Sequence, residues 1–345
     1  MNRIENPSNN RLANCPRSDL AQLNLLGQSP AFFELLRLVE RISSCDAAVL
    51  IYGETGSGKE VIARAIHYLG SRRNAPFIPV NCGAIPDALV ENELFGHTRG
   101  AYTDARESCQ GLIAQADGGT LFLDEIEAMS SRGQVILLRF LQDHEYRPLG
   151  ANLSYTANVR VIAASNADLE RLAEQGLYRL DLLYRLSVLN IRVPPLRERI
   201  DDAPFLAEAF LRRLSVQYGR PPKSLHPDTA AQFNRFHWPG NVRQLENLVH
   251  GAFLLMDDPV ICISPAGLEH HSLSAADASP KGLTTSRFQD AKARTIAQFE
   301  RAYITELLTR SRGNISLAAR IAGKERSRLA KLVKKYGLER HSFGR

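Results

Sequence analysis

The glycine-rich stretch Gly-Glu-Thr-Gly-Ser-Gly-Lys at residues 53–59 constrains the fold of this chain more than any other feature. It follows the apolar run 47–52, which predicts a buried strand, and precedes residues 61–67, which predict a helix. This order is typical of a phosphate-binding loop, whose backbone N–H groups surround phosphate oxygens. The alternative is a glycine-rich turn with a surface lysine. The residues expected to contact the nucleotide are Gly53, Glu54, Thr55, Gly56, Ser57, Gly58, Lys59 and Glu60.

Two neighbouring positions in this loop carry opposite charges. Lys59 is expected to supply a positive charge for the β- and γ-phosphates of a nucleotide. Glu60 departs from the generic motif, which has Ser or Thr at this position as a ligand of Mg²⁺.

A second motif is the apolar run 120–123, which ends in two acidic residues, Asp124 and Glu125. A buried parallel strand presents such carboxylates at its C-terminal end, beside the phosphate loop. We therefore expect Asp124 to hold Mg²⁺, directly or through water, and Glu125 to polarise the water that attacks the γ-phosphate. The alternative is a strand followed by an acidic helix cap.

Further strands alternate with helices along the same half of the chain. The strand predicted at 76–82 ends near Asn81, and the strand predicted at 159–164 leads to Asn166, which either senses the γ-phosphate or caps the next helix. This alternation predicts an α/β fold with a parallel sheet. Beyond residue 194 strand signals fade, which predicts a smaller helical subdomain.

Composition narrows the class of protein. The 345 residues are 44% hydrophobic and 23% charged, which is typical of a soluble protein with two or three domains. No apolar run approaches the length of a membrane span, so we expect a cytoplasmic protein without a membrane partner. The five cysteines form no Cys-x-x-Cys pair, which argues against a disulfide framework or a zinc site.

The C-terminal sixth is strongly basic and helical in pattern. Residues 287–345 contain 15 Lys or Arg against 5 Asp or Glu. Two short helices, at 315–322 and about 325–336, flank Gly323 and predict a helix-turn-helix that binds DNA. The alternative is a plain helical dimerisation tail. The residues expected to contact DNA are Arg326, Ser327, Arg328, Lys331, Lys334 and Lys335.

Together these motifs resemble the bacterial enhancer-binding proteins, the AAA+ ATPases that activate sigma-54 RNA polymerase, over about residues 25–337. In that family the phosphate loop commonly ends in Gly-Lys-Glu, so Glu60 is expected. The resemblance implies an AAA+ P-loop NTPase with a parallel sheet and a helical lid, followed by an all-α Fis-type helix-turn-helix domain. The implied boundaries are 1–24 for a disordered arm, 25–198 for the α/β ATPase subdomain, 199–271 for the lid, 272–286 for a linker and 287–345 for the DNA-binding domain.

The resemblance also implies roles for five further side chains. Asn81 would hold Glu125 back until the nucleotide state is right, and Asn166 would be the first sensor. Arg243 would be the second sensor, in the lid. Arg179 and Arg185 would reach the ATP of a neighbouring subunit, which implies a ring hexamer. For Arg179 alone, a surface salt bridge is the alternative.

The loop that contacts sigma-54 departs from the family pattern, which is Gly-Ala-Phe-Thr-Gly-Ala. Here it consists of Gly100, Ala101, Tyr102, Thr103, Asp104 and Ala105. Tyr102 keeps the aromatic ring, whereas Asp104 adds a negative charge and a Cβ at the contact. The sequence resembles the short members of the family, without an N-terminal regulatory domain, which are controlled by abundance or by a regulatory protein that inhibits or co-activates them.

These expectations combine into one predicted function and two rivals. We predict an Mg²⁺-ATP-driven transcription activator that binds upstream DNA and remodels sigma-54 RNA polymerase for open-complex formation. The first rival is a DNA-binding regulator that uses nucleotide only for oligomeric control and does not drive sigma-54, because of Asp104. The second is a remodelling ATPase with a different protein client.

Overall fold

The structure is a computed structural model that describes residues 25–102, 105, 107–263, 311, 314–321 and 333. Two compact units divide the chain, residues 1–275 and 276–345, and each is described by itself. Within the described ranges, no helix is both long and apolar enough to cross a membrane.

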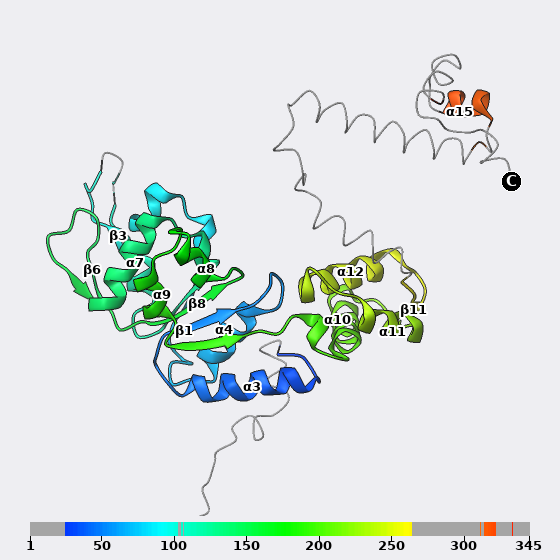
Figure 1. Ribbon diagram of the computed structural model, residues 1–345, viewed down its shortest axis with the longest axis horizontal. Helices are drawn as coiled ribbons and strands as arrows, with labels where there is room; N and C mark the ends of the chain where they lie inside the picture. The colour runs from blue at the N-terminus through cyan, green and yellow to red at the C-terminus, as the bar shows by residue number, and fades with distance from the viewer. Residues whose placement is uncertain are drawn as a thin grey trace, which may run out of the picture. The chain divides into compact units, whose positions relative to one another are not determined.

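The first unit is built on a parallel sheet of five strands (Figure 1). In spatial order the strands are β2 (Phe77–Asn81), β5 (Thr120–Asp124), β8 (Arg160–Ser165), β1 (Val49–Tyr52) and β9 (Leu189–Arg192). Pairing places Asn81 opposite Asp124, and Tyr52 opposite Ser165. The C-terminal ends of the strands therefore meet at one edge, which is where ligands bind in open α/β sheets.

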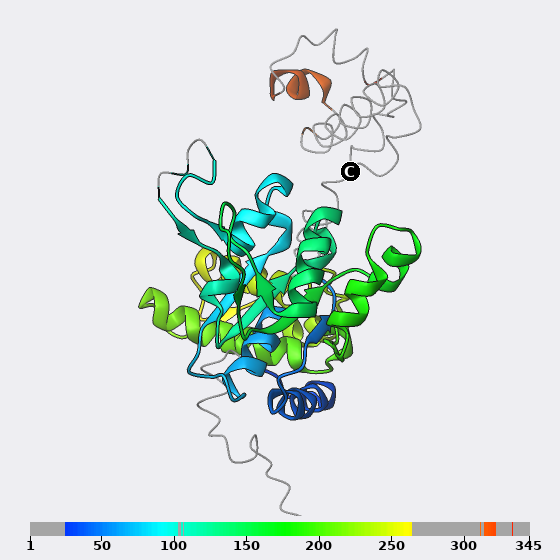
Figure 2. The same cartoon turned by 90° about the vertical axis from the view of Figure 1, so that its left-hand side faces the viewer.

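Helices cover both faces of this sheet (Figure 2). Successive residues of a strand point to opposite faces, so Leu50 packs in one core while Val49 and Ile51 pack in the other. Burial on both sides explains why the strands read as continuous apolar runs. The Val49 side is covered by α3 (Pro30–Ser43) and α4 (Lys59–Tyr68), and the Leu50 side by α5 (Val90–Phe95), α6 (Leu112–Gln115), α7 (Ser131–Asp143), α8 (Leu169–Glu174) and α9 (Leu180–Leu186).

Helix α3 illustrates how the local sequence sets an element's start. The Ser29 side chain accepts a hydrogen bond from the backbone N–H of Phe32, and Pro30 occupies the first turn. The cap and the proline together account for the start of this helix.

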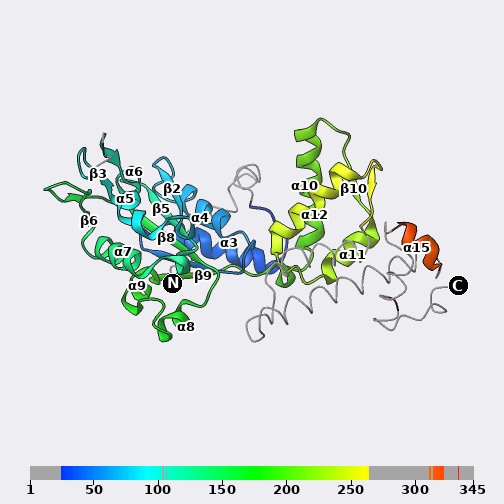
Figure 3. The same ribbon diagram turned by 90° about the horizontal axis from the view of Figure 1, so that it is seen from above.

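A helical lid follows the sheet within the same unit (Figure 3). Its aromatic residue Trp238 is buried, and the indole N–H donates to the carbonyl oxygen of Phe233 at 2.8 Å. The lid consists of α10 (Asp202–Tyr218), α11 (Pro227–Arg235), α12 (Asn241–Leu255) and a parallel pair formed by β10 (Ser224–Leu225) and β11 (Val260–Ile261).

Two short hairpins lie side by side at one end of the sheet (Figures 1 and 3). The first pairs β3 (Gly96–His97) with β4 (Cys109–Gln110), and the second pairs β6 (Glu145–Tyr146) with β7 (Tyr155–Thr156). Backbone hydrogen bonds join them, because Thr98 N donates to Leu149 O at 2.9 Å. The contact loop predicted at residues 100–105 thus lies between the two strands of the first hairpin.

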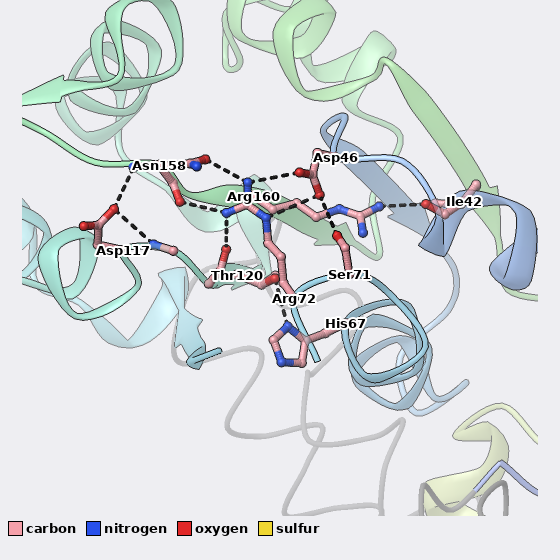
Figure 4. Close-up of polar contacts among 11 residues, drawn as sticks. Ile42, Asp46, His67, Ser71, Arg72, Asp117, Thr120, Asn158 and Arg160 are labelled. Carbon is pink, nitrogen blue, oxygen red and sulfur yellow. Dashed lines mark hydrogen bonds and ion pairs between the residues drawn. The ribbon is translucent and has the colours of Figure 1, made fainter. Parts of the chain in front are cut away.

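A polar network closes the opposite edge of the sheet, where the strands begin (Figure 4). The Arg72 guanidinium donates to the carbonyl oxygens of Gly119 at 3.0 Å and Asn158 at 2.7 Å. It also pairs with Asp46 at 3.3 Å, and this contact is the largest cause that lowers the Asp46 pKa. Nearby, the Arg160 guanidinium donates to Ile42 O at 2.9 Å. This network ties α3, the segment after α4 and the starts of β5 and β8 together.

In the second unit the structure describes α15 (Ile315–Ile321) and three other residues. Asn314 precedes this helix, and its side-chain oxygen accepts from Leu317 N at 3.2 Å. The helix predicted at 315–322 is thus confirmed over its described length. Of the second predicted helix, at about 325–336, only residue 333 is described, and it is helical. All six expected DNA contacts lie outside the described residues: Arg326, Ser327, Arg328, Lys331, Lys334 and Lys335.

Candidate nucleotide-binding site

The phosphate loop joins β1 to α4 through two glycines in the left-handed region. Gly56 has φ +75° and Gly58 has φ +103°, which disfavours a side chain at either position. A Cβ on Gly56 would also collide with the carbonyl oxygen of Gly240 in the lid. The loop therefore combines the turn that phosphate binding needs with a close approach of the lid.

Lys59 begins α4, and its side chain folds back over the loop. The Nζ atom donates to Gly53 O at 2.8 Å and to Glu54 O at 3.3 Å. Burial lowers the Lys59 pKa, whereas the negative charges of Asp124, Glu127 and Glu125 oppose that shift. The ammonium is thus held in the loop with an acidic group of side chains around it.

The two acidic residues stand at the end of β5, as the sequence predicted. Burial is the main cause that raises the Asp124 pKa, and the backbone N–H of Glu125 opposes it by donating to Oδ1 at 3.0 Å. Glu125 itself has φ +52°, so the chain turns sharply after the strand. Oxygen ligands such as the Asp124 carboxylate, with the remaining positions left to water and phosphate, fit the coordination that Mg²⁺ prefers.

Asn81 lies on the neighbouring strand, beside this turn. Its side-chain oxygen accepts from the backbone N–H groups of Gly83 at 2.9 Å and Ala84 at 3.2 Å. A Cβ built on Gly83 would lie 3.1 Å from Glu125 Oε2 and 3.3 Å from Asn81 Oδ1. The two side chains therefore border the same glycine.

A pocket of about 310 Å³ brings most of the predicted nucleotide contacts together. It lies at the C-terminal edge of the sheet, where the lid meets the phosphate loop. Asn166 borders it, and the backbone N–H of Asn166 donates to Glu127 Oε1 at 3.3 Å. Its lining is Thr55, Gly56, Gly58, Lys59, Glu60, Val61, Asp124, Glu125, Asn166, Val242, Arg243 and Glu246.

Three polar side chains of the loop are paired with other residues or buried. Glu60 accepts two hydrogen bonds from Arg64 one turn further along α4. The Glu54 carboxylate pairs with Arg197, at the start of the lid. Ser57 is buried, and its hydroxyl has no partner among the described residues.

The two predicted trans arginines do not line the pocket of their own chain. The Arg179 guanidinium pairs with Asp181, with Nη2 and Oδ2 2.6 Å apart, and its backbone N–H donates to Gln134 Oε1 at 2.9 Å. Arg185 is exposed on α9.

An adjoining apolar cavity of about 260 Å³ was missed by the sequence reasoning. It lies on the other side of the phosphate loop and is bordered by Phe32 of α3, Val61 of α4 and Leu206 of α10. These residues come from three distant segments that carry no motif, so only the fold brings them together.

The predicted contact loop is described in part. Gly100 has φ +80°, and its backbone N–H donates to Ala105 O at 2.8 Å. Tyr102 is about half exposed, and its ring lies 5.0 Å from that of His97, centroid to centroid. Ala101 is described as well, whereas Thr103 and Asp104 lie outside the described residues.

Comparison with known domain families covers most of the chain. Residues 25–192 match a family described as the sigma-54 interaction domain. Residues 197–282 match the AAA+ ATPase lid domain, and residues 295–336 match the bacterial regulatory proteins of the Fis family.

Individual relatives agree with these matches. The DNA-binding transcriptional regulator NtrC of Azospirillum brasilense is 41% identical over 337 residues, which cover 91% of this chain and 69% of the relative. NtrX of Brucella abortus in complex with ADP has a similar structure, with a TM-score of 0.70 and 33% identity over 95% of this chain and 72% of NtrX. Its complex with ATP gives a TM-score of 0.69 and 32% identity, covering 93% and 72%.

Proposed function

This chain belongs to the sigma-54-dependent transcriptional activators of the AAA+ class, and we propose that it works as a ring whose ATP hydrolysis moves the loop around Tyr102. The sigma-54 interaction domain is an ATPase, and the Fis-family domain implies DNA binding. These matches favour the activator over a regulator that does not drive sigma-54. The observation that carries the proposal is one pocket bordered by Lys59, Asp124, Glu125, Asn166 and Arg243.

In this pocket each polar side chain has a distinct part. The triphosphate lies along the loop. Its oxygens replace the carbonyl oxygens of Gly53 and Glu54 as acceptors for the Lys59 ammonium. Glu125 accepts a proton from the attacking water, while Asn81, beside it at Gly83, limits its position. Asn166 and Arg243 contact the γ-phosphate from the sheet and from the lid.

Mg²⁺ would be held by Asp124, directly or through water, together with phosphate oxygens. When bound, the ion neutralises charge on the β- and γ-phosphates. The first turn of α4 supplies no hydroxyl ligand, because Glu60 occupies the position where the generic motif has Ser or Thr. The Glu60 carboxylate pairs with Arg64.

The apolar cavity beside the loop is the place for the base of the nucleotide. It adjoins Ser57 and Gly58 of the phosphate loop, and its wall contains Phe32 and Leu206. An aromatic ring and aliphatic side chains suit the flat faces of a purine. Both the sheet subdomain and the lid would then contact the same ligand.

A neighbouring copy of the chain completes the nucleotide site by contributing its arginines. The copies assemble into a ring, which we take to be a hexamer. Arg179 and Arg185 are exposed and do not line the nucleotide pocket of their own subunit, as a trans arginine requires. Exposed large apolar side chains lie within three residues of them in the sequence and suit burial against another subunit. The exposed members of this group are Leu177, Leu180, Tyr184 and Val188.

The test is ATP-dependent open-complex formation on a sigma-54 promoter by the full chain, with Lys59→Ala as the inactive control. We expect the native protein to open the promoter only with hydrolysable ATP. An Asp104→Gly variant, run beside it, reports on the contact loop. If only Asp104→Gly opened the promoter, the native chain would be a regulator that does not drive sigma-54.

A further inference from the structure

Glu54 belongs to the phosphate loop by sequence, but its carboxylate faces the lid. Arg197, in the short turn Leu196–Glu198 that leads into the lid, donates from Nη1 to Oε2 at 2.7 Å and from Nη2 to Oε1 at 2.5 Å. Such a two-pronged contact fixes both the distance and the orientation of the two groups. The first polar side chain of the loop is therefore committed to a protein partner.

Asn241 joins the same contact from a third segment, at the start of α12. Its Nδ2 donates to Glu54 Oε2 and to Thr55 O, both at 3.1 Å, and its Oδ1 accepts from Leu196 N at 2.8 Å. The residue is fully buried and has φ +50°, a conformation that Asn tolerates better than most residues. One amide thus holds the phosphate loop, the turn before the lid and the lid helix together.

Backbone contacts also bring the phosphate loop and the start of α12 close together. The N–H of Val242 donates to Gly56 O at 3.0 Å, and Gly56 has no room for a Cβ against Gly240. Arg243 follows directly in the first turn of α12 and borders the nucleotide pocket. The position of the Arg243 backbone is therefore set by the same contacts.

The charge of Glu54 has to be neutralised at this place. Hydrogen bonding from Arg197 is the largest cause that lowers the Glu54 pKa to about 2, so the carboxylate is ionised at neutral pH. A negative charge so near the path of a triphosphate would oppose binding if it were free. Arg197 neutralises that charge, and the same contact holds the lid.

We propose that Glu54 is a positioning residue, which with Arg197 and Asn241 forms a lid latch that keeps Arg243 directed at the nucleotide. The latch lets the lid approach the phosphate loop in one orientation, and its opening withdraws Arg243 from the pocket. This rests on the proposed contact between Arg243 and the nucleotide.

The test measures ATP affinity by calorimetry in the full chain, with Glu54→Gln as the main variant. This substitution keeps the size of the side chain but removes its charge, so we expect the Kd for ATP to rise about 3- to 5-fold, the upper part of the range for a partly exposed ion pair. The matched control is Glu198→Gln, because Glu198 accepts a similar fork from Arg192, at 3.0 and 2.8 Å, outside the pocket lining. The control should leave the Kd unchanged.

A double-mutant cycle shows whether Glu54 acts through Arg243. In the Arg243→Ala background, Glu54→Gln should change the Kd by less than about twofold, because the group it positions is gone. If Glu54→Gln raised the Kd by the same factor with and without Arg243, the two effects would be independent and the proposal would be overturned. Arg197→Gln removes the other partner of the same ion pair. If Glu54→Gln does not fold, Arg197→Gln should give the same changes in Kd with and without Arg243.

The remaining outcomes separate the latch from the proposed function. If the native chain binds ATP and Glu54→Gln matches Glu198→Gln, the latch is wrong and the nucleotide site stands. A native chain that bound no ATP would overturn both.

Discussion

Arg179 and Asp181 form a two-pronged ion pair within one chain, with Nε–Oδ1 and Nη2–Oδ2 distances of 3.0 and 2.6 Å. Both side chains are about half exposed, so the pair is open to competition from a stronger anion. Asp181 raises the pKa of Arg179 through this hydrogen bond, and the guanidinium stays charged. To act on a nucleotide in a neighbouring subunit, Arg179 must leave the Asp181 carboxylate and bind the phosphate there instead.

Mixed assemblies test whether Arg179 acts in trans. We expect Arg179→Ala to lower kcat by about 10³-fold, the usual effect of removing such an arginine. Mixing it with an inactive Glu125→Gln protein should restore part of the ATPase activity, since some interfaces then combine an intact Arg179 with an intact Glu125. The control mixes Arg179→Ala with the double variant Arg179→Ala/Glu125→Gln, which offers no intact arginine. Activity no higher than that of the separate proteins would contradict the trans role.

Three of the four strands that the sequence predicted are buried on both faces, and the fourth, β2, is an edge strand. β1, β5 and β8 read as unbroken apolar runs because helices cover the sheet on each side. The edge strand β9 was missed, since among its four residues only Ile191 is buried and the polar Asn190 and Arg192 interrupt the pattern. The hairpin of β6 and β7 was missed for a different reason, because strands of two residues leave no period to detect.

The polar half of the nucleotide pocket was predictable, whereas the apolar half was not. Lys59, Asp124 and Asn166 each follow or precede a strand, and parallel pairing brings such ends to one edge. Phe32 and Leu206 meet only because the lid folds back, and nothing in their local sequence signals a ligand. Which way a loop side chain points was equally hidden from the sequence.

We expect Asp124 to be required for ATPase activity and, at the same time, to lower the stability of the folded protein. Its pKa is raised mainly by burial, so the native state binds this proton more tightly than the unfolded chain does. The resulting destabilisation is fully present above the folded pKa and disappears as pH falls through it. Asp124→Asn should therefore abolish ATPase activity while raising Tm at pH 7 by about 2 °C. The gain should shrink in acid, and a lower Tm at pH 7 would contradict this account.

Asp46 should behave in the opposite way. The hydrogen bond from Arg72 lowers its pKa, so it contributes stability above the unfolded pKa that is lost as pH falls through the folded value. We expect Asp46→Asn to lower Tm at pH 7, and the difference from the native protein to close in acid. Thermal unfolding followed from pH 7 to pH 3 measures this, and a pH-independent difference would exclude the ion pair as its cause.

Arg72 holds the edge of the sheet that lies far from the nucleotide. The Gly119 carbonyl oxygen also accepts the backbone N–H of Arg160, and the Asn158 carbonyl oxygen also accepts that of Gly118. Truncating Arg72 therefore leaves neither carbonyl oxygen without a hydrogen-bond partner. We expect Arg72→Ala to cost about 2 kcal/mol of unfolding free energy. The exposed neighbour Arg73→Ala is the control and should cost less than about 0.5 kcal/mol. ATP affinity should be unchanged in both variants, and a weaker affinity would imply coupling between the two edges.

The apolar cavity is tested by filling it from α4. Val61 borders both this cavity and the phosphate pocket, so Val61→Phe would occupy space that we assign to the base. The KM for ATP should rise about 10-fold, which is a loss of about 1.4 kcal/mol, with little change in kcat because the γ-phosphate contacts remain. Inhibition by inorganic triphosphate, which has no base, should be unaffected. Val216→Phe, at a largely exposed position of α10, is the control for added bulk. Equal weakening of ATP and triphosphate would mean that the cavity serves the phosphate loop and does not hold a base.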